Sequence, residues 1–228
     1  MGWILNIDTA TSHGGICLAK DGTIISVAEL SEQKDHAGWM HVAIKNLLEE
    51  QGHSLHILDA VAITAGPGSY TGLRVAMAAA KGICFALDIP LITENTLKVM
   101  ACGAIEWLKD KPGYTQDHLL CPMLDARRME VFTALYSFQL DEIMPPAAMV
   151  LDENSFKETL QQKKIFFFGN GASKFESILQ HPNATFITPS TGVQHLSALS
   201  TKKFAAQDFA DLAYSEPFYL KAFHDTTR

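Results

Sequence analysis

The sequence has few of the features that mark secreted, metal-binding or membrane-spanning proteins. It holds 4 cysteines in 228 residues, and no two of them form a Cys-x-x-Cys pair. Cys17, Cys84, Cys102 and Cys121 stand apart in apolar stretches, which is typical of buried, reduced thiols and unlike a disulfide framework or a zinc site. No apolar run reaches the roughly 18–20 residues that a membrane-spanning helix requires. We therefore expect a cytoplasmic protein that does not enter the membrane.

The chain also lacks an excess of basic residues. Lysine and arginine number 18 against 25 aspartates and glutamates, which leaves a net charge of −7. Because phosphate contacts need clustered Lys and Arg, such a chain is a poor nucleic-acid binder on its own, and any role on RNA would require a basic partner. Low-complexity tracts are absent too, and the 47% of hydrophobic residues is enough for an ordinary packed core.

Two halves of the chain follow the same plan. In each half an apolar strand ends in an aspartate (Asp8 and Asp125), and a polar turn, two further strands and then alternating helices and strands follow. Asp21-Gly22 is a hairpin signal between two of these strands. The predicted helices cover 36–51, 70–87, 96–109, 153–163, a stretch after Gly171, and 194–212.

Two such lobes, each a mixed sheet with flanking helices, describe the two-lobed actin/sugar-kinase-like (ASKHA) α/β fold. The polar segment 109–117 indicates the boundary, so we expect an N-terminal lobe over 1–110 and a C-terminal lobe over 111–228. We also expect the last segment to pack back toward the N-terminal lobe. In this fold a nucleotide lies between the lobes, and the turn after each first strand holds phosphate.

The residues of that nucleotide cleft are only partly present. A phosphate-binding turn needs glycine, so that backbone N–H groups can approach the anion closely. Ala10 stands at the glycine position of the first turn, and the turn after Asp125 also lacks glycine. The sequence therefore predicts no bound cofactor and at most weak nucleotide binding at a vestigial cleft. That cleft would consist of Asp8, Thr9, Thr11, Ser12, Asp125, Gly169 and Gly171.

Some of these residues have alternative explanations. Gly169 and Gly171 would equally suit a strand-to-helix turn. Arg127 and Arg128, which follow the second aspartate, are candidates for an anion contact, and the alternative is a solvated turn.

The glycine-rich stretch AGPGSYTG at 65–72 does not fit a Walker A phosphate loop. Five residues separate Gly66 from Gly72, and Leu73-Arg74 replaces the required Lys-Ser/Thr pair. We expect a tight turn from a buried strand into a helix instead. The histidines do not fit a metal site either, because His36 and His41 are five residues apart and lie about 140° apart around a helix.

The helix predicted over 70–87 carries only two charged residues, Arg74 and Lys81, and is apolar nearly all round. Such a helix must be covered on nearly all sides, by a neighbouring helix, by another protein or by the core of its own domain. We therefore predict a partner-binding surface on helices 36–51 and 70–87. Its predicted residues are His36, Met40, Ile44, Leu73, Arg74, Met77, Ala80, Lys81 and Cys84.

Together these motifs resemble the family of bacterial tRNA threonylcarbamoyladenosine biosynthesis proteins called TsaB or YeaZ. The resemblance covers nearly the whole chain, and the run GPGSYTGLR is its most specific part. The other segments that carry it are ILNIDTAT (4–11), ENTLKVMA (94–101), LDARRMEVF (124–132), FGNGAS (168–173) and EPFYLK (216–221). The family's first helix usually begins Arg-x-His-Ser with a proline five residues later, whereas this chain has Lys34-Asp35-His36-Ala37 and His41.

The resemblance implies a non-catalytic subunit of the complex that makes N6-threonylcarbamoyladenosine at tRNA position 37. Such proteins bind and activate the transferase TsaD, an ATPase called TsaE joins them, and the two N-lobe helices form the interface or a homodimer. It implies contact with tRNA only through the complex. Two alternatives stay open: a stand-alone kinase-like ATP-dependent phosphotransferase that uses Asp8 and Asp125, and a metal-dependent glycoprotease.

Overall fold

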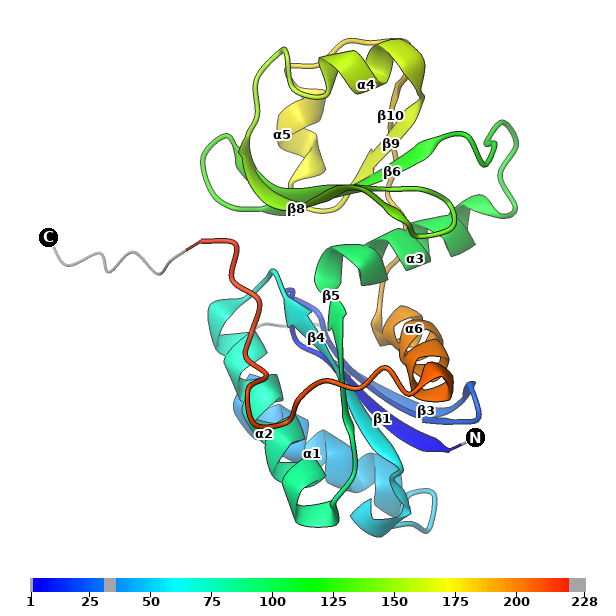
Figure 1. Cartoon of the computed structure of the whole chain (residues 1–228), viewed down its shortest axis with the longest axis vertical. Helices are drawn as coiled ribbons and strands as arrows, with labels where there is room; N and C mark the ends of the chain where they lie inside the picture. Colours follow the sequence, from blue (N-terminus) through cyan, green and yellow to red (C-terminus); the bar gives the residue numbers. More distant parts are fainter. Residues whose placement is uncertain (1, 31–35, 222–228) are drawn as a thin grey trace, which may run out of the picture. The chain divides into compact units, whose positions relative to one another are not determined.

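The computed structural model describes residues 2–30 and 36–221, which divide into two compact units. Among these described residues, unit 1 takes those up to Val99 and Thr191–Phe218, and unit 2 takes Met100–Ser190 and 219–221. Each unit is built around its own five-stranded sheet (Figure 1). The predicted α/β fold, with a mixed sheet and flanking helices in each lobe, is confirmed.

The sheet of unit 1 has the strand order β3-β2-β1-β4-β5. The first three strands are antiparallel neighbours, whereas β4 and β5 run parallel to β1 because helices connect them. The hairpin between β2 and β3 turns at Asp21 and Gly22, which both have positive φ, as the sequence predicts. The strands are β1 Trp3–Asp8, β2 Gly14–Lys20, β3 Thr23–Leu30, β4 Ala60–Gly66 and β5 Leu91–Asn95.

Helices cover both faces of this sheet. Alternate residues of β1 divide between two apolar clusters: Leu5 and Ile7 pack with α1 and α2, whereas Ile4 packs with Phe204 of α6 on the opposite face. Figure 1 shows α1 and α2 together on one side of the sheet and α6 on the other. The helical segments that begin or lie in unit 1 are α1 His36–Glu49, the 3₁₀ turn η1 Leu55–Ile57, α2 Tyr70–Leu87, α3 Thr96–Leu108 and α6 Val193–Ala206.

Polar side chains fix α6 on the sheet as well. The Ser200 hydroxyl donates to Asn6 Oδ1 of β1 at 2.6 Å, and both residues are fully buried. Lys203 Nζ lies 3.6 Å from the buried Glu94 carboxylate of β5 and donates to the Thr93 carbonyl at 2.8 Å. Because buried polar groups are destabilising without partners, these bonds favour one position of α6 on the sheet.

The sheet of unit 2 repeats the plan of the first, with the order β10-β9-β6-β7-β8. Strands β6, β7 and β8 are antiparallel, and β9 and β10 run parallel to β6. Phe167 of β9 lies in the core beside the rings of Phe156, Phe175 and Phe186, at centroid distances of 5.1–5.6 Å. The elements are β6 Leu119–Asp125, β7 Glu130–Tyr136, β8 Glu142–Val150, α4 Lys157–Gln162, β9 Ile165–Phe168, α5 Ala172–Glu176 and β10 Ala184–Phe186.

The division between the units differs from the predicted boundary at residue 110. The contacts pass from one unit to the other within α3, between Val99 and Met100, and the chain returns to unit 1 at Thr191. A polar loop such as 109–117 marks where the chain is exposed, whereas the packing of α3 decides where a unit ends. The last helix is also shorter than predicted, because it ends in the left-handed residue Gln207.

Six of the nine residues predicted for the partner-binding surface lie in the core of unit 1, so the prediction that they are surface residues is wrong. These six residues are Met40, Ile44, Leu73, Met77, Ala80 and Cys84. Helix α2 spans the predicted range, but the side that carries Leu73 faces the sheet and α1, and the side that carries Phe85 faces outward. Any substitution of the six therefore acts first on folding.

The two faces of α2 predict different effects of truncation on stability. Leu73 is 1% exposed and Phe85 is 83% exposed. We expect Leu73→Ala to lower the free energy of unfolding by about 2–5 kcal/mol, because it leaves a cavity in the core. Phe85→Ala, the matched large-to-small change on the same helix, should stay within about 0.5 kcal/mol of the wild type. Urea denaturation measures both values, and equal losses would contradict this orientation of α2.

Candidate functional site

The glycine-rich loop before α2 packs directly on the turn between β1 and β2. Ser69 N donates to the Ala10 carbonyl at 2.7 Å, and the Thr9 hydroxyl donates to the Gly72 carbonyl at 2.8 Å. A Cβ atom on Gly68 would lie less than 3.0 Å from the carbonyl oxygen of Ala10. A Cβ atom on Gly72 would lie less than 3.0 Å from the carbonyl oxygen of Thr9. The two glycines therefore permit a backbone-to-backbone approach, and the loop makes the tight turn that the sequence predicts.

The polar groups of the β1–β2 turn are mostly used within the chain. Asp8 is nearly buried, and its Oδ1 accepts from the Thr64 hydroxyl at 2.8 Å and from Ala10 N at 3.1 Å. Thr9 is fully buried by its bond to the glycine loop. Thr11 and Ser12 stay at the surface, where Thr11 donates to the His13 carbonyl at 3.2 Å. Of the four predicted cleft residues in unit 1, only these last two remain accessible.

The corresponding turn of unit 2 is built around Asp125. Its Oδ1 accepts from Lys174 Nζ at 2.8 Å and from Arg127 N at 2.6 Å. The Lys174 hydrogen bond, followed by the Arg127 backbone N–H, holds the pKa of the Asp125 carboxyl below its usual value. Asp125 therefore carries its negative charge against a lysine of its own chain.

The glycines of the β9–α5 turn also serve packing. Gly169 has a φ of +97°, and a Cβ there would lie less than 3.0 Å from the Met123 carbonyl oxygen. A Cβ on Gly171 would lie 3.1 Å from the nitrogen of Asp125, and its own N–H donates to the Met123 carbonyl at 3.0 Å. The strand-to-helix turn, given above as the alternative to a nucleotide contact, accounts for both glycines.

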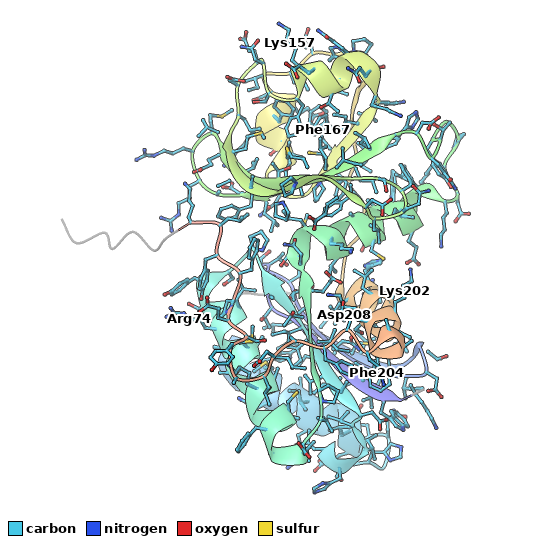
Figure 2. The ribbon with its side chains drawn as sticks, in the orientation of Figure 1. Arg74, Lys157, Phe167, Lys202, Phe204 and Asp208 are labelled. Atoms are coloured by element: carbon cyan, nitrogen blue, oxygen red, sulfur yellow. The ribbon has the colours of Figure 1, made fainter. Side chains whose placement is uncertain are left out.

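The remaining predicted interface residues lie outside the core. Arg74 projects from the outer side of α2, where its guanidinium stacks on the Tyr70 ring at 4.0 Å from the centroid (Figure 2). Lys81 is partly buried, and its Nζ donates to the carbonyls of Ala213 and Ser215, at 3.0 Å each. The side chain of His36 lies outside the described residues.

The segment after α6 runs along α2 as a strap, which we define as residues 207–218 (Figure 1). Ala210 N donates to the Leu91 carbonyl at 2.8 Å, and Phe218 N donates to the Ala65 carbonyl at 2.7 Å. The carbonyl of Phe218 stands where a Cβ on Gly66 would be, so this glycine admits the strap. The strap covers the Lys81 side of α2 and leaves the neighbouring outer side uncovered.

The outer surface of α2 is largely apolar, whereas that of α1 is mixed, with Val42 among the polar residues His41, Lys45, Asn46 and Glu49. Phe85 is 83% and Val42 is 58% exposed. The small residues Ala78, Gly82 and Ala86 are exposed on the same helix as Phe85. We call this set the outer face: His41, Val42, Lys45, Ala78, Gly82, Phe85 and Ala86.

A groove of about 300 Å³ opens between the two helices beside the outer face. Its apolar lining comes from Ile44 and Leu48 of α1, Leu55 of η1 and Ile83 of α2. His41, Lys45 and His53 stand among its polar residues. Exposed apolar surface of this kind, framed by polar residues, is typical of protein-binding sites.

One signal in the sequence could have located the outer face. Arg74 is a charged residue that prefers water, and Phe85 follows it by 11 residues, which at about 100° per residue returns to within about 20° of the same side. Ala78 and Gly82 occupy the i+4 and i+8 positions of that same side. This pattern is hard to detect in the sequence because nearly every side of the helix is apolar.

The structure offers little for metal or thiol chemistry. In residues 2–30 and 36–221, no three His, Cys, Asp or Glu side chains gather closely enough to hold a metal ion. Burial raises the pKa of the Cys17 and Cys84 thiols to about 11 and that of Cys121 to about 12, so these thiols stay protonated near neutral pH. No described helix combines the length and apolar character that crossing a membrane requires.

Comparison with known proteins connects this geometry to one family. The family described as TsaD, tRNA N6-adenosine threonylcarbamoyltransferase, matches residues 24–223. The chain is 28% identical over 225 residues to the tRNA threonylcarbamoyladenosine biosynthesis protein TsaB of Bacillus subtilis, covering 96% of this chain and 93% of that protein. It is 37% identical over 139 residues to TsaB of Escherichia coli, covering 61% of this chain and 56% of that protein.

Solved structures agree on the fold. A Pseudomonas aeruginosa protein described as similar to peptidase YeaZ superposes with a TM-score of 0.78 at 23% identity, over 97% of this chain and 100% of that one. At this identity the likeness establishes a shared two-lobed fold, and the function has to be argued from the residues.

The contact between the glycine loop and the first turn can be tested with a matched pair of glycines in α2. Gly72→Ala should lower the free energy of unfolding by about 2 kcal/mol or more, because the new Cβ meets the Thr9 carbonyl. Gly82→Ala has nothing within 4 Å of its Cβ and should stabilise by up to about 1 kcal/mol through helix propensity. Thermal unfolding followed by circular dichroism measures both, and a neutral Gly72→Ala would contradict the packing.

Proposed function

Since the chain belongs to the tRNA N6-adenosine threonylcarbamoyltransferase (TsaD) family and is similar to TsaB proteins over nearly its whole length, we propose that it is a non-catalytic subunit that works with a TsaD protein. Its role is in the threonylcarbamoyladenosine modification of tRNA. We propose that it binds a TsaD protein through the outer face and thereby activates threonylcarbamoyl transfer. The observation that carries this proposal is the uncovered apolar surface of α2 around Phe85, together with the groove between α1 and α2.

Phe85 supports the proposal most strongly. An aromatic side chain that is 83% exposed keeps much of its apolar surface in water. Covering it would contribute about 1.5–3 kcal/mol to association, and buried aromatic anchors dominate many interfaces. Ala78, Gly82 and Ala86 beside it are small, so a helix of the partner can approach α2 closely.

The charges near the outer face also favour a protein partner. Arg74 and Lys81 are the only charged residues of α2, and both are engaged within unit 1, by the Tyr70 ring and by the strap carbonyls. The α2 residues of the outer face (Ala78, Gly82, Phe85 and Ala86) carry no charge, so a partner would cover them without removing a charge of this helix from water. That lowers the free-energy cost of forming the interface.

The state of the first turn supports a non-catalytic role. The carboxylate of Asp8 bonds Thr64 and Ala10, and the hydroxyl of Thr9 bonds the glycine loop. In unit 2, Asp125 pairs with Lys174. A stand-alone phosphotransferase would need these groups to hold a nucleotide and its metal ion, so we rank that alternative second. The glycoprotease alternative has no cluster of metal ligands in the described part of the chain to support it.

The wider assembly follows from the same proposal. A TsaE protein would join the complex, and tRNA would be held by the complex in the cytoplasm rather than by this chain alone, whose net charge is −7. The outer face pairs a projecting Phe85 with a nearby groove, which is the kind of surface that can also pair with a second copy of itself. We propose that such a homodimer and the TsaD complex use the same face and exclude each other.

A charge placed in the outer face tests the proposal. We expect Phe85→Asp to weaken binding to a TsaD protein by about 30-fold or more, since hot-spot losses exceed about 2 kcal/mol. Ile143→Asp is the matched control, because Ile143 is 55% exposed and lies in unit 2. Binding is measured by isothermal titration calorimetry, and folding of each variant by circular dichroism.

The proposed interface is wrong if Phe85→Asp binds TsaD with the affinity of the wild type. The expected result is a folded Phe85→Asp chain that neither binds TsaD nor supports threonylcarbamoylation of tRNA, and a fully active Ile143→Asp chain.

A further inference from the structure

The turn between β6 and β7, residues 126–129, carries two arginines in a backbone conformation that arginine rarely adopts. Arg127 has a φ of 69° and Arg128 a φ of 47°. Successive residues with positive φ in a hairpin turn favour Asn-Gly or Gly-Gly, because a Cβ there crowds the following carbonyl oxygen. The sequence thus keeps two long cationic side chains where the backbone favours small ones. Conflicts of this kind occur mainly at functional sites.

The turn is held in place without either guanidinium group. Arg127 N donates to Asp125 Oδ1 at 2.6 Å, and Ala126 N donates to the Glu130 carbonyl at 3.0 Å. Leu151 N bonds the Met129 carbonyl at 2.7 Å and ties the turn to the end of β8. The backbone and the Asp125 side chain therefore determine the shape of the turn.

Lysines already neutralise the carboxylates beside the turn. Lys174 pairs with Asp125 at 2.8 Å, and Lys221 pairs with Glu130. The guanidinium groups of Arg127 and Arg128 are left exposed, with no ion-pair or hydrogen-bond partner among the described residues. They are an unmatched local positive charge on a chain whose net charge is −7.

A guanidinium group recognises phosphate through two parallel N–H···O bonds from its planar fork. We propose that Arg127 and Arg128 contact the phosphodiester backbone of tRNA when the chain is assembled with its TsaD partner. This inference rests on the proposed function, because the acidic chain needs the complex to hold RNA. Contacts of this type fix the position of the RNA and do not read its sequence.

The test is tRNA binding by the complex of the full chain with a TsaD protein, measured by fluorescence anisotropy over a series of salt concentrations. For Arg127→Gln with Arg128→Gln we expect about tenfold weaker binding near physiological salt. The slope of log K against log salt should fall by about 1.5, since each phosphate contact contributes about 0.7–0.9.

The matched control removes the same two charges elsewhere. Lys157 and Lys202, both labelled in Figure 2, are exposed, and their side-chain ammonium groups have no ion-pair or hydrogen-bond partner in the described part of the chain. Lys157→Gln with Lys202→Gln should leave the affinity and the salt slope unchanged. Arg127→Lys with Arg128→Lys keeps both positive charges but removes the planar guanidinium groups that can donate two parallel hydrogen bonds. The tRNA affinity of this variant should therefore lie between those of the wild type and the glutamine variant.

A further variant separates an RNA contact from a structural role. Arg127→Asn with Arg128→Gly suits the positive φ values of the turn, so its unfolding temperature should equal or exceed that of the wild type. Its tRNA affinity should still fall as far as that of the glutamine variant. A lower unfolding temperature, or unchanged tRNA affinity, would contradict the proposal.

Two other outcomes identify what has failed. If the complex forms and the glutamine variant binds tRNA with the wild-type affinity and salt slope, the RNA contact is overturned while the proposed function stands. If inorganic phosphate or ATP binds the isolated chain through these arginines and tRNA binding is unaffected, the turn is a free-anion site and the RNA contact is overturned. If the wild-type chain does not co-elute with TsaD, both proposals fail together.

Discussion

The close approach of two backbones at the start of α2 is the constraint on which most of unit 1 depends. Ser69 N bonds the Ala10 carbonyl, the Thr9 hydroxyl bonds the Gly72 carbonyl, and both contacts require glycine at the crossing points. This contact fixes where α2 begins and therefore which side of it faces the sheet. It also uses polar groups of the first turn that a phosphate would otherwise contact. The contact between the glycine loop and the first turn therefore leaves one side of α2 uncovered and gives the turn a structural role.

Unit 2 uses a related device with a different result. Gly169 and Gly171 let the β9–α5 turn approach the end of β6, and Lys174 pairs with Asp125 there. In unit 1 the first residues of the turn, Thr9 and Ala10, are buried against the glycine loop, whereas in unit 2 the corresponding turn presents Arg127 and Arg128 to solvent. The shared strand plan therefore supports two kinds of contact: an apolar one on the helices of unit 1 and a cationic one on a turn of unit 2.

The sequence predicts the fold well because strands and helices follow from local patterns. Helix α2 has the predicted bounds of 70–87, and both sheets have the predicted mixture of pairings. The interface residues were predicted poorly for a physical reason. Periodicity separates the sides of a helix only when one side is polar, and in α2 both are apolar. Which side is buried depends on where the glycine loop and the strap hold the helix, and both contacts join residues distant in the chain.

Hydrogen–deuterium exchange of the full chain, recorded alone, with a TsaD protein and with ATP, tests the central claim most directly. The claim is that the chain acts through the outer face of α1 and α2 and that its first turn is structural. We predict that TsaD slows amide exchange in peptides covering α1 and α2, and that ATP leaves residues 8–13 unchanged. Slower exchange of residues 8–13 with ATP, or no change in α1 and α2 with a bound TsaD protein, would contradict the account.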